Sequence, residues 1–293
     1  MTLTWLDLGY AVVVGGGVGL ISGLFGVGGG FLIVPLLNIL LKVPMELAVG
    51  AGSCQVLGPA TTSILARRIN KKQLQLPLTI AGGLFAGVLL GASTLELAKT
   101  SGKVTLFQKD ILLTELIVLS TYFVLLLSVG LFAVKESMKA ADSNVERRGL
   151  FSHWLIPPYA NLPEFENVPV SIVVIAWFGL GTGFVSGLLG MSGGLVLLPG
   201  LIYLLGIKTE RAIVASILMV WMVSFQGTIV HAWHGNINLW LVAALLLGGT
   251  LGARIGTEMS VQIGGRKLRQ GFGGLLLATS LIIAARLIKL LWL

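Results

Sequence analysis

The chain contains two copies of one long apolar segment, and each copy is interrupted by a cluster of glycines. Residues 17–35 and 181–199 align without a gap at a spacing of 164 positions, and nine of the nineteen aligned residues are identical. The matches include Ser22 with Ser186 and Pro35 with Pro199, so they do not come from abundant glycine alone. Glycine clusters inside apolar segments are typical of the broken helices that form binding sites in membrane transporters. The duplication therefore predicts two related repeats with a similar feature in each.

The composition is that of an integral membrane protein. Hydrophobic residues make up 55% of the 293 positions and charged residues only 11%, against roughly 25% charged in soluble domains. Eight apolar stretches reach the roughly 20 residues that a membrane helix needs: 9–41, 45–66, 75–98, 110–134, 169–206, 211–230, 237–257 and 270–292. Little chain remains for a soluble catalytic domain. We therefore expect a multi-pass protein of the cell inner (plasma) membrane that is not an enzyme.

Two further features of the composition exclude other classes of protein. The net charge of +8 arises from basic residues near helix ends, where they set topology, so we expect no nucleic-acid partner. The single cysteine, Cys54, forms no intramolecular disulfide and offers no cluster of metal ligands. We expect neither a metal nor a cofactor, and no ATP-binding motif is present in the sequence.

The distribution of Lys and Arg predicts which connections face the cytoplasm. Fourteen of the twenty basic residues fall in four connections, at 67–72, 135–148, 208–211 and 254–269. Because cytoplasmic loops carry an excess of Lys and Arg, these four connections are expected inside. Segment 9–41 must then begin and end outside, and segment 169–206 must begin and end inside. Arg286 and Lys289 are the exception, because this topology places them on the outer side.

Both long segments are therefore expected to double back as helical hairpins. A straight helix of 33 residues would be about 50 Å long, well beyond a hydrocarbon core of about 30 Å. Glycine tolerates positive φ and is a poor helix former, so the breaks are predicted at 26–30 and 190–194. The sequence leaves open whether the arms span the bilayer fully or half-way.

The loop charges further predict that the two repeats have opposite orientations. The equivalent connections 67–74 and 231–238 differ, since the first is strongly basic and the second has no Lys or Arg. The expected fold is an all-α polytopic membrane protein of two inverted repeats, each a glycine-broken hairpin plus three transmembrane helices. The predicted boundaries are 1–134 for the first repeat, 135–168 for a cytoplasmic linker and 169–293 for the second repeat.

The glycine breaks are candidate anion sites. A helical arm that starts inside the membrane leaves its first backbone N–H groups without intrahelical partners, and an anion can satisfy them with help from the helix dipole. The alternative is that the glycines serve only a tight turn. Buried Gln amides need partners, so one Gln from each repeat is added to the candidates. The substrate-binding candidates are Ser22, Gly26, Gly28, Gly29, Gly30, Gln55, Ser186, Gly190, Ser192, Gly193, Gly194 and Gln226.

Other polar residues and glycines have more ordinary interpretations. Hydroxyls in the same helices can bond to their own backbone, which weakens them as candidates: Ser53, Thr61, Thr62, Ser216, Ser224 and Thr228. His231 and His234 flank Trp233 and are interpreted as part of a membrane-interface belt, with a metal or proton role as the alternative. Glu115 lies inside a span and is a candidate for a coupling proton. Glycines at i, i+4 spacing predict helix-packing faces: Gly15, Gly19, Gly23, Gly83, Gly87, Gly91, Gly179, Gly183, Gly187, Gly248, Gly252 and Gly256.

At these glycine turns the chain resembles the sulfite exporter TauE/SafE family of membrane permeases. The family's Gly-x-Gly-Gly-Gly turn, followed by an apolar run and proline, corresponds here to 26–30 with Pro35 and to 190–194 with Pro199. The stretch 231–238 also resembles a short loop of that family. Ser192 stands where the family pattern has glycine. The resemblance implies secondary transport of small sulfur-containing anions, such as sulfite or organosulfonates.

The expected function is therefore transport of a small anionic substrate across the lipid bilayer by alternating access around the two glycine turns, coupled to a proton or sodium ion. An anion channel is the nearest alternative. An intramembrane serine protease is the alternative from another class, because Gly190-Met-Ser-Gly193 fits the G-x-S-G pattern of rhomboid proteases, with His231 as the base. The sequence does not select the anion, the direction of transport or the oligomeric state.

Overall fold

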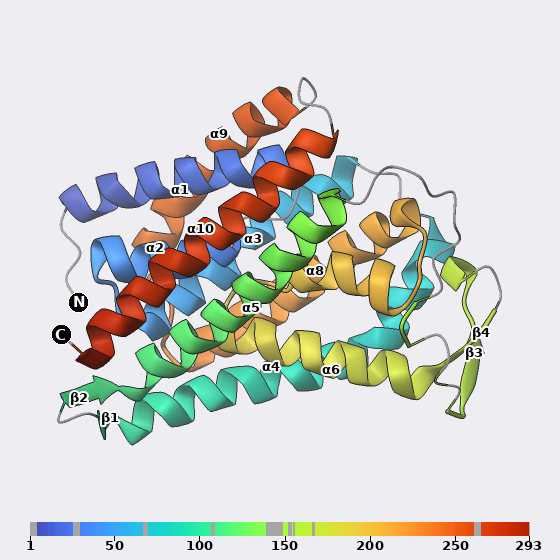
Figure 1. Ribbon diagram of the computed structural model, residues 1–293, viewed down its shortest axis with the longest axis horizontal. Helices are drawn as coiled ribbons and strands as arrows, with labels where there is room; N and C mark the ends of the chain where they lie inside the picture. The colour runs from blue at the N-terminus through green and yellow to red at the C-terminus, as the bar shows by residue number, and fades with distance from the viewer. Residues whose placement is uncertain are drawn as a thin grey trace.

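The protein is described by a computed structural model that covers residues 5–25, 30–66, 70–106, 109–138, 149–151, 154, 156–165, 168–260 and 265–292. Most of it is α-helical (Figure 1). The α-helices of the first part are α1 Trp5–Phe25, α2 Gly30–Leu41, α3 Met45–Ala66, α4 Gln75–Ser101 and α5 Leu113–Met138. Those of the second part are α6 Ile172–Leu189, α7 Gly194–Pro199, α8 Thr209–Trp233, α9 Leu239–Ser260 and α10 Gly265–Trp292. Shorter helical turns are η1 Lys71–Leu74, η2 Pro163–Phe165 and the π-helical η3 Gly200–Leu204.

Two short β-hairpins depart from the helices-only prediction. Strand β1 Lys103–Leu106 pairs antiparallel with β2 Lys109–Leu112, between α4 and α5. Strand β3 Tyr159–Asn161 pairs antiparallel with β4 Pro169–Ser171, just before α6. Both hairpins lie in connections between helices, so the helical architecture is unaffected. The predicted linker at 135–168 also differs at its start, because α5 continues to Met138.

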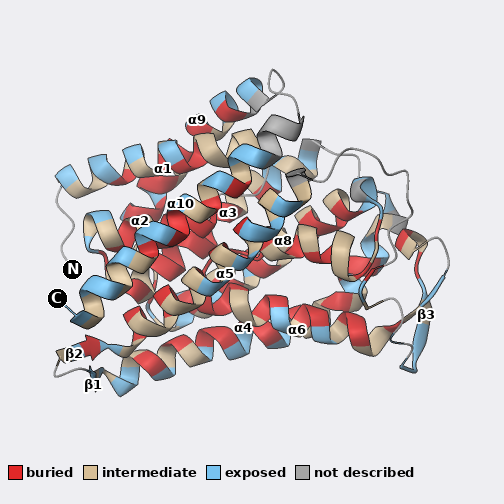
Figure 2. Ribbon diagram, in the orientation of Figure 1, coloured by how far each residue is buried: buried red, intermediate tan, exposed pale blue. Residues whose placement is uncertain are grey.

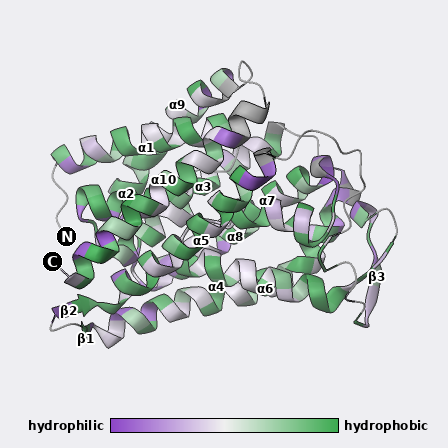
Figure 3. Cartoon of the chain, in the orientation of Figure 1, coloured by the Kyte–Doolittle hydropathy of each residue, from purple (hydrophilic) through white to green (hydrophobic). Residues whose placement is uncertain are grey.

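Seven helices in the described part of the chain are long and apolar enough to cross a membrane: α1, α4, α5, α6, α8, α9 and α10. Helix α3 has 22 residues but is not among them, because its glycines, hydroxyl residues and Gln55 lower its hydropathy. Hydrophobic residues dominate the long helices, and hydrophilic residues gather toward helix ends and connections (Figure 3). Together these features make the chain a multi-pass membrane protein.

The second arm of each broken hairpin is about half the length of a membrane span. Helix α2 has 12 residues, and α7 with η3 adds up to another short apolar helix, Gly194–Leu204. At 1.5 Å per residue these arms are about 16–18 Å long, whereas the hydrocarbon core is about 30 Å thick. The first arm α1, with 21 residues, is about 32 Å long. By length, therefore, α1 is long enough to span the core, whereas each second arm is long enough for only part of it.

The predicted glycine faces are packing faces, and they join helices from different halves of the chain. A Cβ built on Gly83, Gly87 or Gly91 of α4 would strike the backbone of α6. A Cβ built on Gly248, Gly252 or Gly256 of α9 would strike the backbone of α1 in the same way. The backbones are therefore in direct contact, as small-residue faces permit. In both pairs, residues later in one helix contact residues later in the other. Helix α4 therefore runs parallel to α6, and α1 runs parallel to α9.

The remaining helices at equivalent positions in the two halves pack against each other in antiparallel directions. In α3 and α8, Ser53 lies beside Gly227, while Thr61 accepts a hydrogen bond from Trp221. In α5 and α10, contacts run from Glu115 with Arg286 at one end to Val134 with Gly273 at the other. Helix α2 is largely enclosed by the others, and most of its residues are buried (Figure 2).

Candidate functional site

The second glycine break is a tight loop in which three backbone positions have positive φ. Gly190 ends α6 with φ +65°, and its N–H donates to Ser186 O at 2.8 Å. Ser192 and Gly193 follow with φ +59° and +72°. Glycine adopts this region without strain, whereas a serine does so at a cost. The predicted break is thus confirmed at 190–193, and Ser192 is the residue that this loop does not favour conformationally.

Helix α7 begins directly after this loop with unbonded amide groups. Its first helical hydrogen bonds are donated by the amides of Val196 and Leu197, both to Gly193 O at 2.9 and 2.7 Å. The amides before Val196 therefore have no intrahelical partner, as is general at helix starts. Gly193 has no room for a side chain, because a Cβ there would lie 2.6 Å from Ser186 Oγ. The loop is closely fitted to the last turn of α6.

The first break is only partly described. Helix α1 ends at Phe25 and α2 begins at Gly30, which agrees with a break between them. The candidates Gly26, Gly28 and Gly29 lie outside the described residues. Ser22 is half-buried in the last turn of α1.

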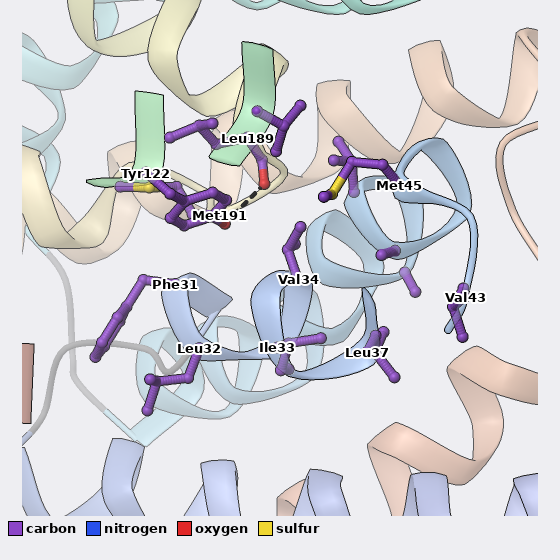
Figure 4. Packing of buried hydrophobic residues seen from close by; sticks show 14 of the residues in the cluster. Phe31, Leu32, Ile33, Val34, Leu37, Val43, Met45, Tyr122, Leu189 and Met191 are labelled. Carbon is purple, nitrogen blue, oxygen red and sulfur yellow. Dashed lines mark hydrogen bonds between the residues drawn. The ribbon is translucent and has the colours of Figure 1, made fainter. Parts of the chain in front are cut away.

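The start of α2 meets the second break beside helix α3. A Cβ on Gly30 would lie 3.2 Å from Met191 O, and one on Gly52 of α3 would lie 2.6 Å from Gly190 O. Figure 4 shows Met191 and Leu189 facing the α2 residues Phe31 and Val34 in this region. The structure thus brings the candidates Gly30 and Gly190 together beside α3, with Met191 between them in the contact.

Tyr122 of α5 supports the end of α6, and the sequence interpretation missed it. Its hydroxyl donates to Leu189 O at 2.9 Å, and its side chain has no exposed surface (Figure 4). The bond satisfies a carbonyl that the end of α6 would otherwise leave without a partner. A lone tyrosine inside an apolar helix was the available signal, because its hydroxyl must find a partner in the membrane.

Several buried polar atoms around the α3–α8 crossing have no hydrogen-bond partner in the described part of the chain. Ser192 Oγ and Ser224 Oγ are unpaired, and these residues are 2% and 1% exposed. The Oε1 atoms of Gln55 and Gln226 are unpaired as well. An unsatisfied buried polar group costs about 1–3 kcal/mol. Each of these groups would be stabilised by a ligand or water that completes its bonding.

The two Gln side chains are directed toward other helices rather than into the break. Gln226 Nε2 donates to Phe85 O of α4 at 2.9 Å. Gln55 Nε2 lies 2.5 Å from the position of a Cβ on Gly249 of α9. The two contacts are alike, since each Gln reaches a helix in the other half of the chain. Each Gln therefore links a central helix to a helix of a tightly packed pair.

The remaining hydroxyl candidates mostly bond to their own helices. Ser186 Oγ donates to Thr182 O at 2.8 Å, and Thr61 Oγ1 and Ser216 Oγ bond one turn back in the same way. Thr62 does so too. Their hydrogen bonds are satisfied without a ligand, so they are weaker candidates than Ser192.

The structure changes the interpretation of two titratable residues. Glu115 forms an ion pair of 2.7 Å with Arg286 at the end of α10. The sequence interpretation did not foresee this partner for Arg286. His231 was interpreted as part of an interface belt, and that is wrong: its side chain is fully buried, whereas neighbouring Trp233 is 88% exposed.

The geometry does not match a serine protease. His231 Nε2 lies 3.1 Å from Gly187 O, and Ser192 Oγ has no hydrogen-bond partner in the described part of the chain, so no serine–histidine bond exists there. Nor do the described residues contain a group of three or more side chains suited to hold a metal ion. What the arrangement offers chemically is a set of buried hydroxyls and amide groups at a helix break.

Comparison with known proteins places this architecture in a family. The family model described as "Sulfite exporter TauE/SafE" matches residues 11–283. The chain belongs to this family. The match extends over both glycine breaks, and it confirms the resemblance inferred from the duplicated turn.

Relatives in the TauE/SafE family are named as membrane transporters rather than enzymes. The chain is 25% identical over 264 residues to the probable membrane transporter protein YunE of Bacillus subtilis, covering 86% of this chain and 89% of that protein. It is 25% identical over 270 residues to YjnA of the same organism, covering 90% and 94%. A probable membrane transporter protein of Xylella fastidiosa is 34% identical over 116 residues, covering 39% of this chain and 44% of that protein. No solved structure is a significant match.

Proposed function

We propose that the protein is a secondary transporter that moves small sulfur-containing anions, such as sulfite or organosulfonates, by alternating access. The anion is held where the start of α2 meets the second glycine break beside α3. The observation that carries the proposal is the buried, unpaired hydroxyl of Ser192 in a strained loop at the start of a half-length helix. The family's description as sulfite exporters supports the substrate class.

The chemistry of the break suits a small anion. The hydroxyl of Ser192 and the amides before Val196 are hydrogen-bond donors, and the positive end of a helix dipole favours negative charge. The described parts of the helices around the break carry Lys or Arg only near their ends. Binding therefore rests on dipoles and hydrogen bonds rather than on ion pairs. Such a site favours a singly charged anion over a doubly charged one, because uncompensated charge is costly to bury.

We also propose that residues 1–134 and 169–293 form inverted repeats joined by a cytoplasmic linker. The support comes from helix directions. Helices α3 and α8 occupy the same position in the two repeats and run antiparallel, and so do α5 and α10. Equivalent helices that run in opposite directions are expected when the symmetry axis lies in the membrane plane.

The packing limits which parts move during transport. Helices α1 and α9, and likewise α4 and α6, are in backbone contact, and each pair contains one helix from each repeat. One whole repeat therefore cannot rock against the other without breaking both pairs. We propose that the half-length arms and the α3–α8 crossing move against these fixed pairs. The buried Ser192 indicates that this conformation is closed around the site.

Flux measurements in liposomes test the proposed function. We expect saturable uptake of labelled sulfite or of a small alkylsulfonate, stimulated by the same unlabelled anion inside the vesicles, and weaker uptake of sulfate. Flux that rises linearly with concentration and shows no counterflow would indicate a channel. Absence of flux for every sulfur anion would remove the proposed substrate class.

The Ser192→Gly variant tests the proposed site. Glycine suits the positive φ of this position, so the fold is retained while the hydroxyl is lost. A hydrogen bond to a charged group contributes about 1.5–3 kcal/mol, so we expect the KM to rise roughly tenfold or more. Ser216→Ala is the matched control, since that buried hydroxyl is already bonded to Ile213 O. An unchanged KM in Ser192→Gly would show that the hydroxyl does not bind substrate.

Cysteine accessibility tests the inverted repeats. Cys54 is the single native cysteine and is first replaced by alanine. New cysteines at Asn70 and Gly235 then occupy equivalent connections, after α3 and after α8, and both positions are exposed. We expect a membrane-impermeant thiol reagent to label them from opposite sides of the membrane. Labelling from the same side would rule out inversion.

A further inference from the structure

We infer that His231 is the proton-binding residue that couples anion transport to a proton carried in the same direction. The inference rests on the proposed function, and it names the coupling ion and the group that carries it. His231 lies near the end of α8, and its side chain has no exposed surface.

One ring nitrogen of His231 is occupied and the other is free. Nε2 lies 3.1 Å from Gly187 O. Because a carbonyl oxygen only accepts, Nε2 must carry a hydrogen, which leaves Nδ1 of the neutral ring as a proton acceptor. Nδ1 is buried and has no hydrogen-bond partner in the described structure. His231 thus combines a fixed orientation with an open site for one proton.

The hydrogen bond connects His231 to the moving region. Gly187 belongs to the last turn of α6, one turn before the break at Gly190. The backbone of His231 also accepts from Asn236 N at 2.8 Å, which ties the end of α8 to the following loop. A change of charge on this imidazole therefore acts directly on the helix that ends at the proposed anion site.

The other buried titratable side chains of the described helices do not offer such a site. Glu115 is held in its ion pair with Arg286. The hydroxyl of Tyr122 donates to Leu189 O, and neither Tyr nor Cys ordinarily changes charge near neutral pH. Cys54 and Glu164 are buried as well, and Glu164 lies in the short turn η2 of the connection before α6 rather than in a long helix. Histidine is the side chain whose unperturbed proton affinity falls in the physiological range.

The charged groups that face His231 are partly exposed and bonded to one another. From α4 come Glu96, with a side chain 25% exposed, and Lys99, which pairs with it at 3.2 Å. Asn236 bonds to both, at 3.3 Å to Glu96 Oε2 and at 2.9 Å to Lys99 Nζ. On α8 itself the neighbour is His234, half-buried and directed to Val230 O. In the described part of α3, the charged residue is Glu46, in the first turn. Helix α6 contains no charged residue.

Protonation of His231 is unfavourable in the closed conformation without a bound anion. A proton on Nδ1 would leave a buried positive charge with no hydrogen-bond acceptor among the described residues, which is costly. The cost falls if the anion binds nearby, because the two charges then compensate each other. Proton and anion binding are therefore mutually favourable, and such coupling is reciprocal. The proton comes from water on one side and returns to water on the other.

The test compares flux with and without a pH gradient in liposomes, with the membrane potential held at zero by potassium and valinomycin. The substrate is a small alkylsulfonate, whose own charge does not change over the pH range used. We expect wild-type uptake to accelerate when the outside is acidic. Counterflow at equal pH, measured in the same vesicles, reports substrate exchange that needs no gradient.

The decisive variant is His231→Gln, with His234→Gln as the matched control. A Gln amide can still donate to Gly187 O but binds no proton near neutral pH. We expect His231→Gln to keep counterflow and to lose the acceleration by the gradient, while His234→Gln responds like wild type. A gradient response in His231→Gln equal to that of wild type overturns the inference.

A second measurement on the wild-type protein covers the case in which His231→Gln fails to fold. If one proton binds with each anion, the apparent affinity for the alkylsulfonate falls by up to about tenfold per pH unit above the titration of the histidine. A flat affinity between about pH 5.5 and pH 8, on either side of the ordinary titration of histidine, overturns the inference. Wild-type counterflow that is present but insensitive to pH also overturns the inference about His231. That result leaves the proposed transport function intact. Absence of any saturable flux instead refutes the proposed function.

Discussion

Adding one methyl group at Gly87 is expected to separate α4 from α6 and to destabilise the protein. A Cβ at this position would lie 2.6 Å from Phe184 N, whereas an ordinary contact is at least 3.4 Å. The Cβ would come still closer to Leu180 O, so the two helices must move apart by more than about 0.8 Å, the difference between these two distances. Gly82 provides the matched control, because it lies on the same helix and a Cβ there meets nothing within 4 Å.

The magnitude follows from comparing the two alanine variants. Both gain the same helix propensity, about 1 kcal/mol, so this contribution cancels in the difference between them. The overpacking at Gly87 remains and typically costs about 1–3 kcal/mol. With roughly 2–4 °C of melting temperature per kcal/mol for a chain of this size, Gly87→Ala should melt about 2–12 °C below Gly82→Ala.

Cys54 supplies the readout for this experiment. It is the single cysteine of the chain, it is buried, and a thiol-reactive dye will label it as the detergent-purified protein unfolds. Neither glycine is near the proposed anion site, so transport activity is not needed for the comparison. If the melting temperature of Gly87→Ala equals or exceeds that of Gly82→Ala, the direct backbone contact between α4 and α6 is refuted.

Three further substitutions probe individual interactions with the same melting assay. Tyr122→Phe removes the bond to Leu189 O and should lower stability by about 1 kcal/mol, the usual value of such a bond in a membrane protein; no change would mean that the carbonyl finds another donor. Glu115→Gln leaves the partly buried charge of Arg286 unpaired and should cost about 1–3 kcal/mol, and the added change Arg286→Gln should recover part of the loss. Ser192→Gly should raise the melting temperature slightly, because it relieves a positive φ of +59°.

The helix breaks were predictable because their cause is local. Glycine lowers helix propensity wherever it occurs, so a cluster at 190–194 predicts the break without knowledge of the fold. The sequence interpretation left the length of the second arms open, although the apolar sequence after each break ends at Leu41 and Leu205, close to where these arms end. At the end of α2, Asn38 Nδ2 donates a hydrogen bond to Val43 O and Lys42 has a positive φ. A hydropathy pattern predicts neither feature.

The glycine spacing predicted packing faces but not their partners. A period of four places Gly83, Gly87 and Gly91 on one side of α4, and it carries no information about which helix lies there. The partner proved to be α6, with α1 and α9 as the equivalent pair. The pairing of Glu115 with Arg286 was missed for the same reason, because these residues are 171 positions apart.

For the candidate site, sequence reasoning identified the loop and misjudged part of its surroundings. Ser192, Gly190 and Gly193 lie at the break as expected. Gln55 and Gln226 were grouped with it because buried amides need partners, yet their contacts lie with α9 and α4. The direction of a side chain depends on helix rotation, which periodicity fixes poorly in helices that are apolar on all sides.

The exchange of helices between the halves also has a consequence for how the chain is assembled during synthesis. Helix α1 is synthesised long before α9, to which the glycine face that it packs against belongs. Until α9 is inserted, α1 has only lipid or a temporary neighbour along that face. The first repeat synthesised alone would therefore lack both α9 and α6, and we expect it to be degraded or to associate with a separately synthesised second repeat. Co-expression of the two halves from separate messages should restore a folded protein.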